Sequence, residues 1–220
     1  MKKLSVIAIF SFVGIVAFAQ SEKYVKSMEP KVVAIDTTHS ADALKDLANS
    51  FERIADVEKN QWLPYYYAAL ANVNAGFMMG MSGGNTGGNA SVTDPIADKS
   101  EALLNKAEAL SKDNSEIYIV KKQIATLRMM ADPMSRYMTY GPAAAEALAT
   151  AKKLNPENPR VYLLEGQDKF YTPEQFGGSK EEAKKLFEEA RKKYESFKPE
   201  STIHPSWGMA QIQYFMSQMK

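Results

Sequence analysis

One spacing recurs in four segments of the chain: three apolar or small residues that lie four and then three positions apart. The sets are Leu47/Phe51/Ile54, Ser100/Leu104/Ala107, Ala144/Leu148/Ala151 and Ala183/Phe187/Ala190. Residues with this spacing share one face of a helix. The middle residue is large in every set, and small residues flank it in the last three. Because small side chains let helices approach closely, the spacing predicts closely packed helices.

Tyrosines extend this pattern. A tyrosine follows the last member of each of the first three sets by eleven residues, at Tyr65, Tyr118 and Tyr162. A small residue stands four positions after two of them, at Ala69 and Gly166. We expect each ring to fill the wedge between adjacent helical hairpins.

Together, these features resemble the tetratricopeptide repeat, whose unit of about 34 residues is a pair of helices. The resemblance covers residues 40–220. The sequence departs from the family pattern at four positions. Leu104 and Leu148 stand where the family has Phe, and Lys122 stands where a small residue is expected. Ser201 stands where a fourth aromatic residue is expected, and Trp207 would take over its role. The resemblance implies an all-α solenoid of about three helical hairpins with flanking helices.

Three further segments resemble those of a group of exported tetratricopeptide-like proteins from Bacteroidetes-type bacteria. They are Pro64-Tyr65-Tyr66-Tyr67, Tyr171-Thr172-Pro173 with Phe176-Gly177-Gly178, and His204-Pro205-Ser206-Trp207-Gly208. Because that group is described only by its repeats, this resemblance implies no activity.

Signals for helix starts and stops predict where each helix lies. Helices are expected from Ser40 through Ile54, from Leu63 to Met79, from Pro95 to Leu110, from Ser115 to Met130, from Pro142 to Asn155, from the Asn155–Pro159 turn through Gly166, from Ser179 through Ala190, and from Pro205 to Met219. A short helix is expected within residues 21–38, where Pro30 interrupts it. No long window alternates with period two, so no sheet is expected.

The first residues have the composition of a targeting segment. Two lysines precede an apolar run over residues 4–18, which ends at Ala17-Phe18-Ala19. This pattern predicts a signal peptide over residues 1–19, cut near Ala19, because the run is too short for a membrane anchor. No cysteine follows it for a lipid anchor. We expect an exported protein, periplasmic or secreted, with an N-terminal segment over residues 20–39 and a repeat domain over residues 40–220.

Composition excludes several classes of function. The chain has 27 basic residues, 26 acidic residues and no cysteine. Interspersed and nearly balanced charge argues against nucleic acid as a partner and against a basic membrane-binding patch. The lack of cysteine excludes disulfides, thiol catalysis and Cys-ligated metals, so stability must come from packing. About 200 residues can bury an adequate core.

The links between the expected helices differ in length. Links between pairs are short, at residues 59–61, 112–114 and 155–158, whereas links inside pairs are long, at residues 80–94, 132–141 and 171–178. Because helices alternate in direction, the long links should emerge on one edge of the stack, which often marks the working face of a repeat protein. The glycine-rich link over residues 80–94 is expected to be a mobile loop.

Candidate partner-binding residues lie on this edge and on the expected concave face. The edge carries Arg136, Tyr137, Tyr171 and Phe176, and the concave face carries Tyr66, Asn72, Asn74, Gln123 and Gln167. Arg136 is suited to clamp a carboxylate or to stack on an aromatic ring, with a surface ion pair to Asp132 as the alternative. Tyr66 has packing as its alternative, because aromatic residues at helical spacing usually belong to a core.

No pattern predicts a metal, nucleotide or cofactor. His39 and His204 are the only histidines, and neither belongs to a ligand-like cluster. Methionines near residues 78–81 and 129–138 are suited to bind Cu(I), but gap filling or an apolar partner surface is favoured without nearby Cys or His. The glycines at residues 83–88 follow no strand, and their loop has too few acidic residues for calcium.

These observations predict a non-enzymatic, exported helical-repeat scaffold that binds a protein or peptide segment. The alternative is a periplasmic carrier that holds a small or lipid-like ligand in a Tyr- and Met-lined cavity between repeats. A scaffold predicts an open groove with exposed aromatic residues, whereas a carrier predicts a closed apolar cavity. An enzyme is not expected, because no nucleophile, metal or acid–base constellation is evident.

Overall fold

The computed structural model describes residues 21–81 and 89–219, and this part is helical without a strand. The helices are α1 (Glu22–Thr37), α2 (Ala41–Val57), α3 (Trp62–Met81), α4 (Ala90–Leu110), α5 (Ser115–Met130), α6 (Pro133–Leu154), α7 (Pro159–Tyr171), the short 3₁₀ helix η1 (Glu174–Phe176), α8 (Lys180–Ser196) and α9 (Met209–Ser217). The expected signal peptide and the centre of the glycine-rich link lie outside the described residues. The expected all-α fold is confirmed for the described part.

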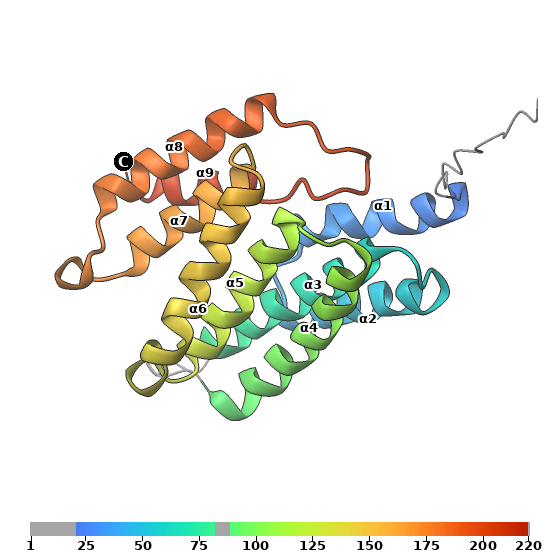
Figure 1. Ribbon diagram of the computed structural model, residues 1–220, viewed down its shortest axis with the longest axis horizontal. Coiled ribbons are helices and arrows are strands. Elements are labelled where there is room, and N and C mark those ends of the chain that lie inside the picture. Colours follow the sequence, from blue (N-terminus) through green and yellow to red (C-terminus); the bar gives the residue numbers. More distant parts are fainter. Residues whose placement is uncertain (1–20, 82–88, 220) are drawn as a thin grey trace, which may run out of the picture.

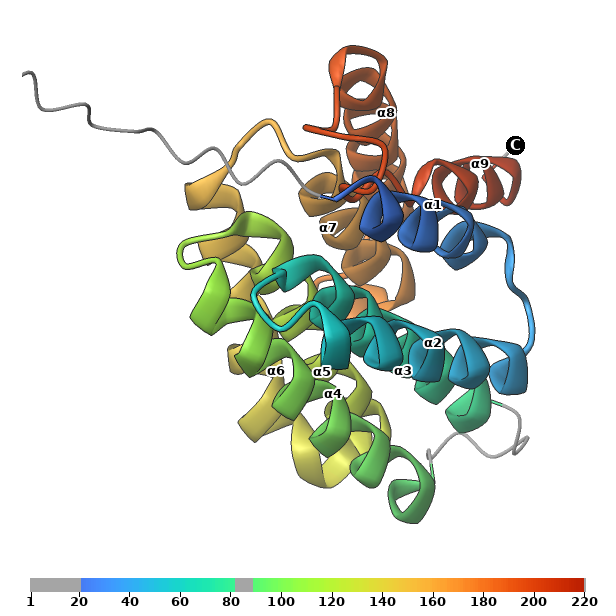
Figure 2. The same cartoon turned by 90° about the vertical axis from the view of Figure 1, so that its right-hand side faces the viewer.

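Consecutive helices pack in pairs that stack side by side (Figures 1 and 2). α3 packs along α2 and α4, α5 packs along α6, and α7 packs along α8. The C-terminal ends of α3, α5 and α7 point toward the same side of the molecule, on the left of Figure 1. The expected stack of helical hairpins is therefore confirmed, whereas its assignment to the tetratricopeptide family stays a prediction.

Two helices begin earlier than the sequence predicts. α4 starts at Ala90 rather than Pro95, and α6 starts at Pro133 rather than Pro142, while Pro30 lies inside α1. An interior proline removes one helical hydrogen bond and leaves a carbonyl unpaired. All three interior prolines are exposed, so the freed carbonyl can bind water and the helix continues.

The last helix begins later than predicted. Gly208 precedes it with φ at 117°, a left-handed conformation that favours glycine. The chain from Pro205 to this turn is not helical, so α9 starts only after it.

α3 is buried from residue 63 to residue 73. α2 and α4 flank it, and α1 and α5 also pack against it. The Tyr66 hydroxyl is buried and donates to Glu116 at 3.1 Å, and the Asn72 amide donates to a carbonyl one turn earlier at 3.0 Å. Protein therefore covers this part of the expected concave face, which gives Tyr66 the packing role that was its alternative.

Residues 197–208 form a crossing segment between α8 and α9 that returns to the first helices (Figure 1). The Tyr67 hydroxyl donates to the carbonyl of Ile203 at 3.0 Å. The backbone N–H of Gly208 donates to both carboxylate oxygens of Asp36 in α1, at 3.1 Å each. The C-terminal part of the chain thus covers the helices at its start.

Candidate ligand-binding groove

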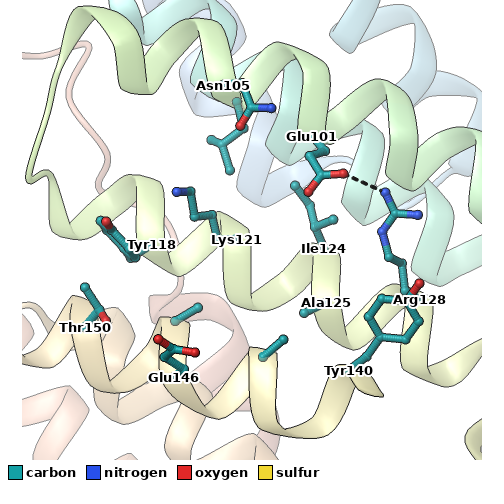
Figure 3. A pocket seen from close by; sticks show the side chains of 13 residues that line it. Glu101, Asn105, Tyr118, Lys121, Ile124, Ala125, Arg128, Tyr140, Glu146 and Thr150 are labelled. Atoms are coloured by element: carbon teal, nitrogen blue, oxygen red, sulfur yellow. Dashed lines mark hydrogen bonds and ion pairs between the residues drawn. The ribbon is translucent and has the colours of Figure 1, made fainter. Parts of the chain in front are cut away.

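An open groove lies between α4 and α6, with α5 as its floor (Figure 3). Both walls pack against α5, and the packing of α5 on α6 is extensive. The volume of the groove is about 360 Å³. It lies on a different face from the predicted concave surface, because the second helices of two pairs form its walls.

The floor of the groove is apolar. Leu104 of α4 and Ile124 and Ala125 of α5 contribute to it, and all three are buried. Ala143 and Ala147 of α6 face the groove from one wall. Because they lie four positions apart on a helix, they share a face. Their small side chains occupy little of the space between the two walls. The recurring set of the same helix, Ala144/Leu148/Ala151, is buried and faces the core.

Tyrosines stand at opposite ends of the groove. Tyr118 of α5 lies at one end, near Thr150, and Tyr140 of α6 lies at the other (Figure 3). The ammonium group of Lys121 lies 4.6 Å from the centre of the Tyr118 ring, within the range of a cation–π contact. Both ends of the apolar floor therefore offer an aromatic ring and a hydroxyl group.

Two cations of α5 reach the groove, and both are paired. Arg128 bonds Asp98 at 2.7 Å and Glu101 at 2.9 Å, and Lys121 bonds Glu108 at 2.6 Å. Burial alone would lower the pKa of Arg128, but the hydrogen bond to Asp98 and the negative charges of both partners outweigh it, so the pKa lies above its usual value. Glu101 and Glu146 also line the groove, so its lining carries two positive and two negative side chains.

Arg136, a residue that the sequence singles out, lies beside the Tyr140 end of the groove. Its guanidinium forms a bidentate ion pair with Asp94 of α4, at 2.6 and 2.8 Å, and donates to the carbonyl of Arg128 at 3.2 Å. The expected alternative, a pair with Asp132, does not form: Asp132 instead caps α6 by accepting hydrogen bonds from Ser135. The surface ion pair exists, with a different partner.

The aromatic candidates of the loop edge are exposed. The exposed fractions are 60% for Tyr137, 67% for Tyr171 and 75% for Phe176. Tyr137 belongs to α6, whereas Tyr171 ends α7 and lies edge-on to Phe215 of α9. Burial, and to a lesser degree Tyr214, raises the pKa of Tyr171. That these residues contact a partner stays a prediction.

Among the other candidates of the concave face, Gln123 is buried, and Asn74 and Gln167 are half-buried. The side-chain amide of Gln167 donates to Gln211 of α9 at 3.0 Å. α9 and the crossing segment, like α1, thus occupy space that an open repeat would leave to a partner.

The groove has a signal in the sequence that the repeat pattern obscures. Tyr140, Ala143, Ala147 and Thr150 recur three, four and three positions apart and form one stripe of α6. The buried set of the same helix, Ala144/Leu148/Ala151, has nearly the same spacing. In the sequence alone, the stripe therefore cannot be distinguished from an ordinary helix face. Only the arrangement of α4 and α6 around α5 turns it into a groove wall.

Residues 21–81 and 89–219 contain neither a cluster of metal-ligating side chains nor a membrane-spanning helix. No group of three or more histidine, aspartate or glutamate side chains is arranged to hold a metal ion there. No helix of that part combines the length and the apolar character that crossing a bilayer requires.

The chain is similar to a protein of known structure. No protein-family model and no curated protein sequence matches it. Among solved structures, the HusA haemophore from Porphyromonas gingivalis matches with 34% sequence identity and a TM-score of 0.76. The match covers 91% of this chain and 94% of that one. Identity at this level over nearly the whole of both chains shows common descent, and the chain therefore belongs to the family of the HusA haemophore.

Proposed function

We propose that this protein is an exported carrier that binds haem, or a closely related planar porphyrin, in the groove between α4 and α6. The observation that carries the proposal is the 34% identity to a haemophore over 91% of the chain. This function corresponds to the carrier alternative of the sequence analysis, with an open groove in place of a closed cavity. Export rests on the predicted signal peptide.

The size and lining of the groove suit such a ligand. Haem is a flat, largely apolar ring with a pair of carboxylate groups on one edge. Ligand sites in proteins commonly measure about 300–1,000 Å³, and a volume of about 360 Å³ in an open groove suits a ring whose edge stays in solvent. Ile124 and Leu104 offer apolar contact to the ring, and Tyr118 and Tyr140 offer aromatic contact at either end.

Lys121 and Arg128 of α5 are suited to bind the carboxylate groups on the edge of haem. Lys121 and Arg128 are seven positions apart on the same helix and both line the groove. The side chains of two present partners, Asp98 and Glu101, are 68% and 57% exposed. Because both carboxylates are exposed while Arg128 lines the groove, ligand carboxylates can reach Arg128 and take the place of these partners. A carrier needs no catalytic group, and the proposal includes none.

Titration of the purified protein with ferric haem, followed by absorbance, tests the proposal. We expect saturable binding to the wild type. Ala147→Phe places a large side chain in the groove and should weaken binding at least tenfold, which corresponds to about 1.4 kcal/mol. Ala149→Phe is the matched control, because Ala149 is exposed on the same helix and does not line the groove. Absence of haem binding by the wild type, or equal weakening by both variants, would refute the proposed site.

Protein binding is the second candidate, and the exposed side chains of Tyr137, Tyr171 and Phe176 favour it. Native mass spectrometry of the protein purified from its own cell envelope separates the two candidates. A retained mass of porphyrin size supports the carrier, whereas a retained polypeptide supports the scaffold.

A further inference from the structure

One ion pair connects the two walls of the groove. Asp94 lies in the second turn of α4 and Arg136 in the first turn of α6, and their bidentate pair has distances of 2.6 and 2.8 Å. Among the hydrogen bonds and ion pairs within residues 21–81 and 89–219, this pair alone joins α4 directly to α6. Both walls also pack on α5, which lies between them.

The pair is also fixed to the floor. Arg136 donates a further hydrogen bond to the carbonyl of Arg128, in the last turn of α5, at 3.2 Å. Arg128 and Tyr140, one turn beyond Arg136, line the end of the groove at this point (Figure 3). The hydrogen bond from Arg136 holds the pKa of Asp94 below its usual value, so the pair is charged at neutral pH. Three helices therefore meet at a single guanidinium group.

The first two turns of α6 have little other support. Met134, Tyr137 and Met138 are 95%, 60% and 81% exposed. The first buried residue of α6 is Ala144, about three turns from its start. Arg136 is thus the side chain that anchors the free end of this wall.

We propose that Asp94 and Arg136 form a clasp that sets the separation of α4 and α6, and with it the entry and release of the ligand in the groove. Both are positioning residues that act through the shape of the groove. The role in ligand release rests on the proposed function, whereas the separation of the two helices is a property of the protein alone. The two parts can therefore be tested separately.

Electron paramagnetic resonance between two spin labels measures the separation directly. The chain has no cysteine, so Ala102→Cys on α4 and Met138→Cys on α6, both exposed, give one defined pair of labels. We expect a narrow distance distribution with the clasp intact. Arg136→Ala should broaden it and shift it to longer distances.

The matched control breaks another ion pair of α4. Lys99 pairs with Glu52 of α2 at 2.6 Å, and Glu52→Gln removes that pair while leaving the clasp in place. This control should leave the distance distribution unchanged. The reversed pair, Asp94→Arg with Arg136→Asp, should narrow the distribution again, a rescue that general loss of folding would not produce.

The rate of haem release tests the second part, measured by transfer of haem to an excess of a tighter-binding protein. We expect Arg136→Ala to raise the release rate about fivefold, which corresponds to the ~1 kcal/mol upper limit for a partly exposed ion pair. Equal distance distributions in the wild type and Arg136→Ala would overturn the clasp itself. A changed distribution with an unchanged release rate would overturn its role in release. If the wild type binds no haem, both the proposed function and the role of the clasp in release are refuted. The distance measurement still decides whether the clasp exists.

Discussion

Replacement of Arg160 by methionine is expected to remove a large share of the folding stability. Arg160 is fully buried in α7, and its Nε lies 3.0 and 2.9 Å from the two carboxylate oxygens of Glu116 in α5. The rings of Phe197 and Trp207 lie 4.8 and 5.7 Å from its guanidinium carbon. One side chain therefore joins two helices and the crossing segment.

The magnitude follows from the charge that remains. Arg160→Met leaves the carboxylate of Glu116, whose side chain is 13% exposed, with only the neutral donors Asn158 and Tyr66 beside it. Removal of one partner of a buried ion pair costs about 3–5 kcal/mol, against a total stability of about 5–15 kcal/mol for a typical domain. Glu116→Gln in the same protein removes the unpaired charge and keeps an acceptor. The double variant should therefore be more stable than the sum of the single losses predicts, by about 0.5–3 kcal/mol.

Urea unfolding followed by circular dichroism measures these differences at neutral pH. Arg191→Met is the control, because Arg191 is exposed on α8, and it should change stability by less than about 0.5 kcal/mol. A loss below about 1 kcal/mol for Arg160→Met would show that the ion pair is not essential to the fold. Strictly additive losses in the double variant would show that no coupling exists between the two charges.

Two further predictions concern close packing and charge. Gly166→Ala would place a Cβ atom 2.6 Å from a ring carbon of Phe187, which is stacked on Phe215 and cannot move away. We therefore expect calorimetry to show a loss of about 1–3 kcal/mol in the free energy of unfolding. An unchanged melting temperature would contradict the packing argument. Because pairing with Arg136 lowers the pKa of Asp94, the stabilisation by this pair should be present at neutral pH and lost as the pH falls through the lowered pKa. NMR titration of the Asp94 carboxyl carbon should show a midpoint that is higher in Arg136→Ala than in the wild type. An equal midpoint in both proteins would refute the pairing.

The sequence predicted those features in which a local pattern and a packing requirement agree. The small residue at Gly166 predicts a close helix approach, and the ring of Phe187, the middle member of the fourth set, lies directly against it. Ser179 predicts a helix start, and its hydroxyl accepts the backbone N–H of Glu182 at 3.1 Å. Such features depend on neighbours one turn or one hairpin away, which the sequence shows.

Features that depend on distant segments could not be predicted in the same way. Tyr66 and Asn72 belong to the face of α3 that an open repeat would leave accessible, but α1 and the crossing segment pack over this region. The helix starts at Pro95 and Pro142 were wrong because exposure to water, which a local proline rule ignores, lets each helix continue.

The groove was missed for a related reason. Its walls are separated by the way in which α4 and α6 pack on α5, and the pair that links them, Asp94 with Arg136, is 42 positions apart in the chain. Arg136 stands out in the sequence as a charged residue beside aromatic and methionine neighbours. Its partner does not, because no local pattern relates the two.

The crossing segment changes how the molecule should unfold. In an open repeat array each unit contacts only its neighbours, so terminal units fray independently and folding spreads along the chain. Here the bonds of Ile203 with Tyr67 and of Gly208 with Asp36 join residues 136 and 172 positions apart. Loss of the C-terminal residues would therefore expose the N-terminal helices, and the first and last units should melt together in one cooperative transition.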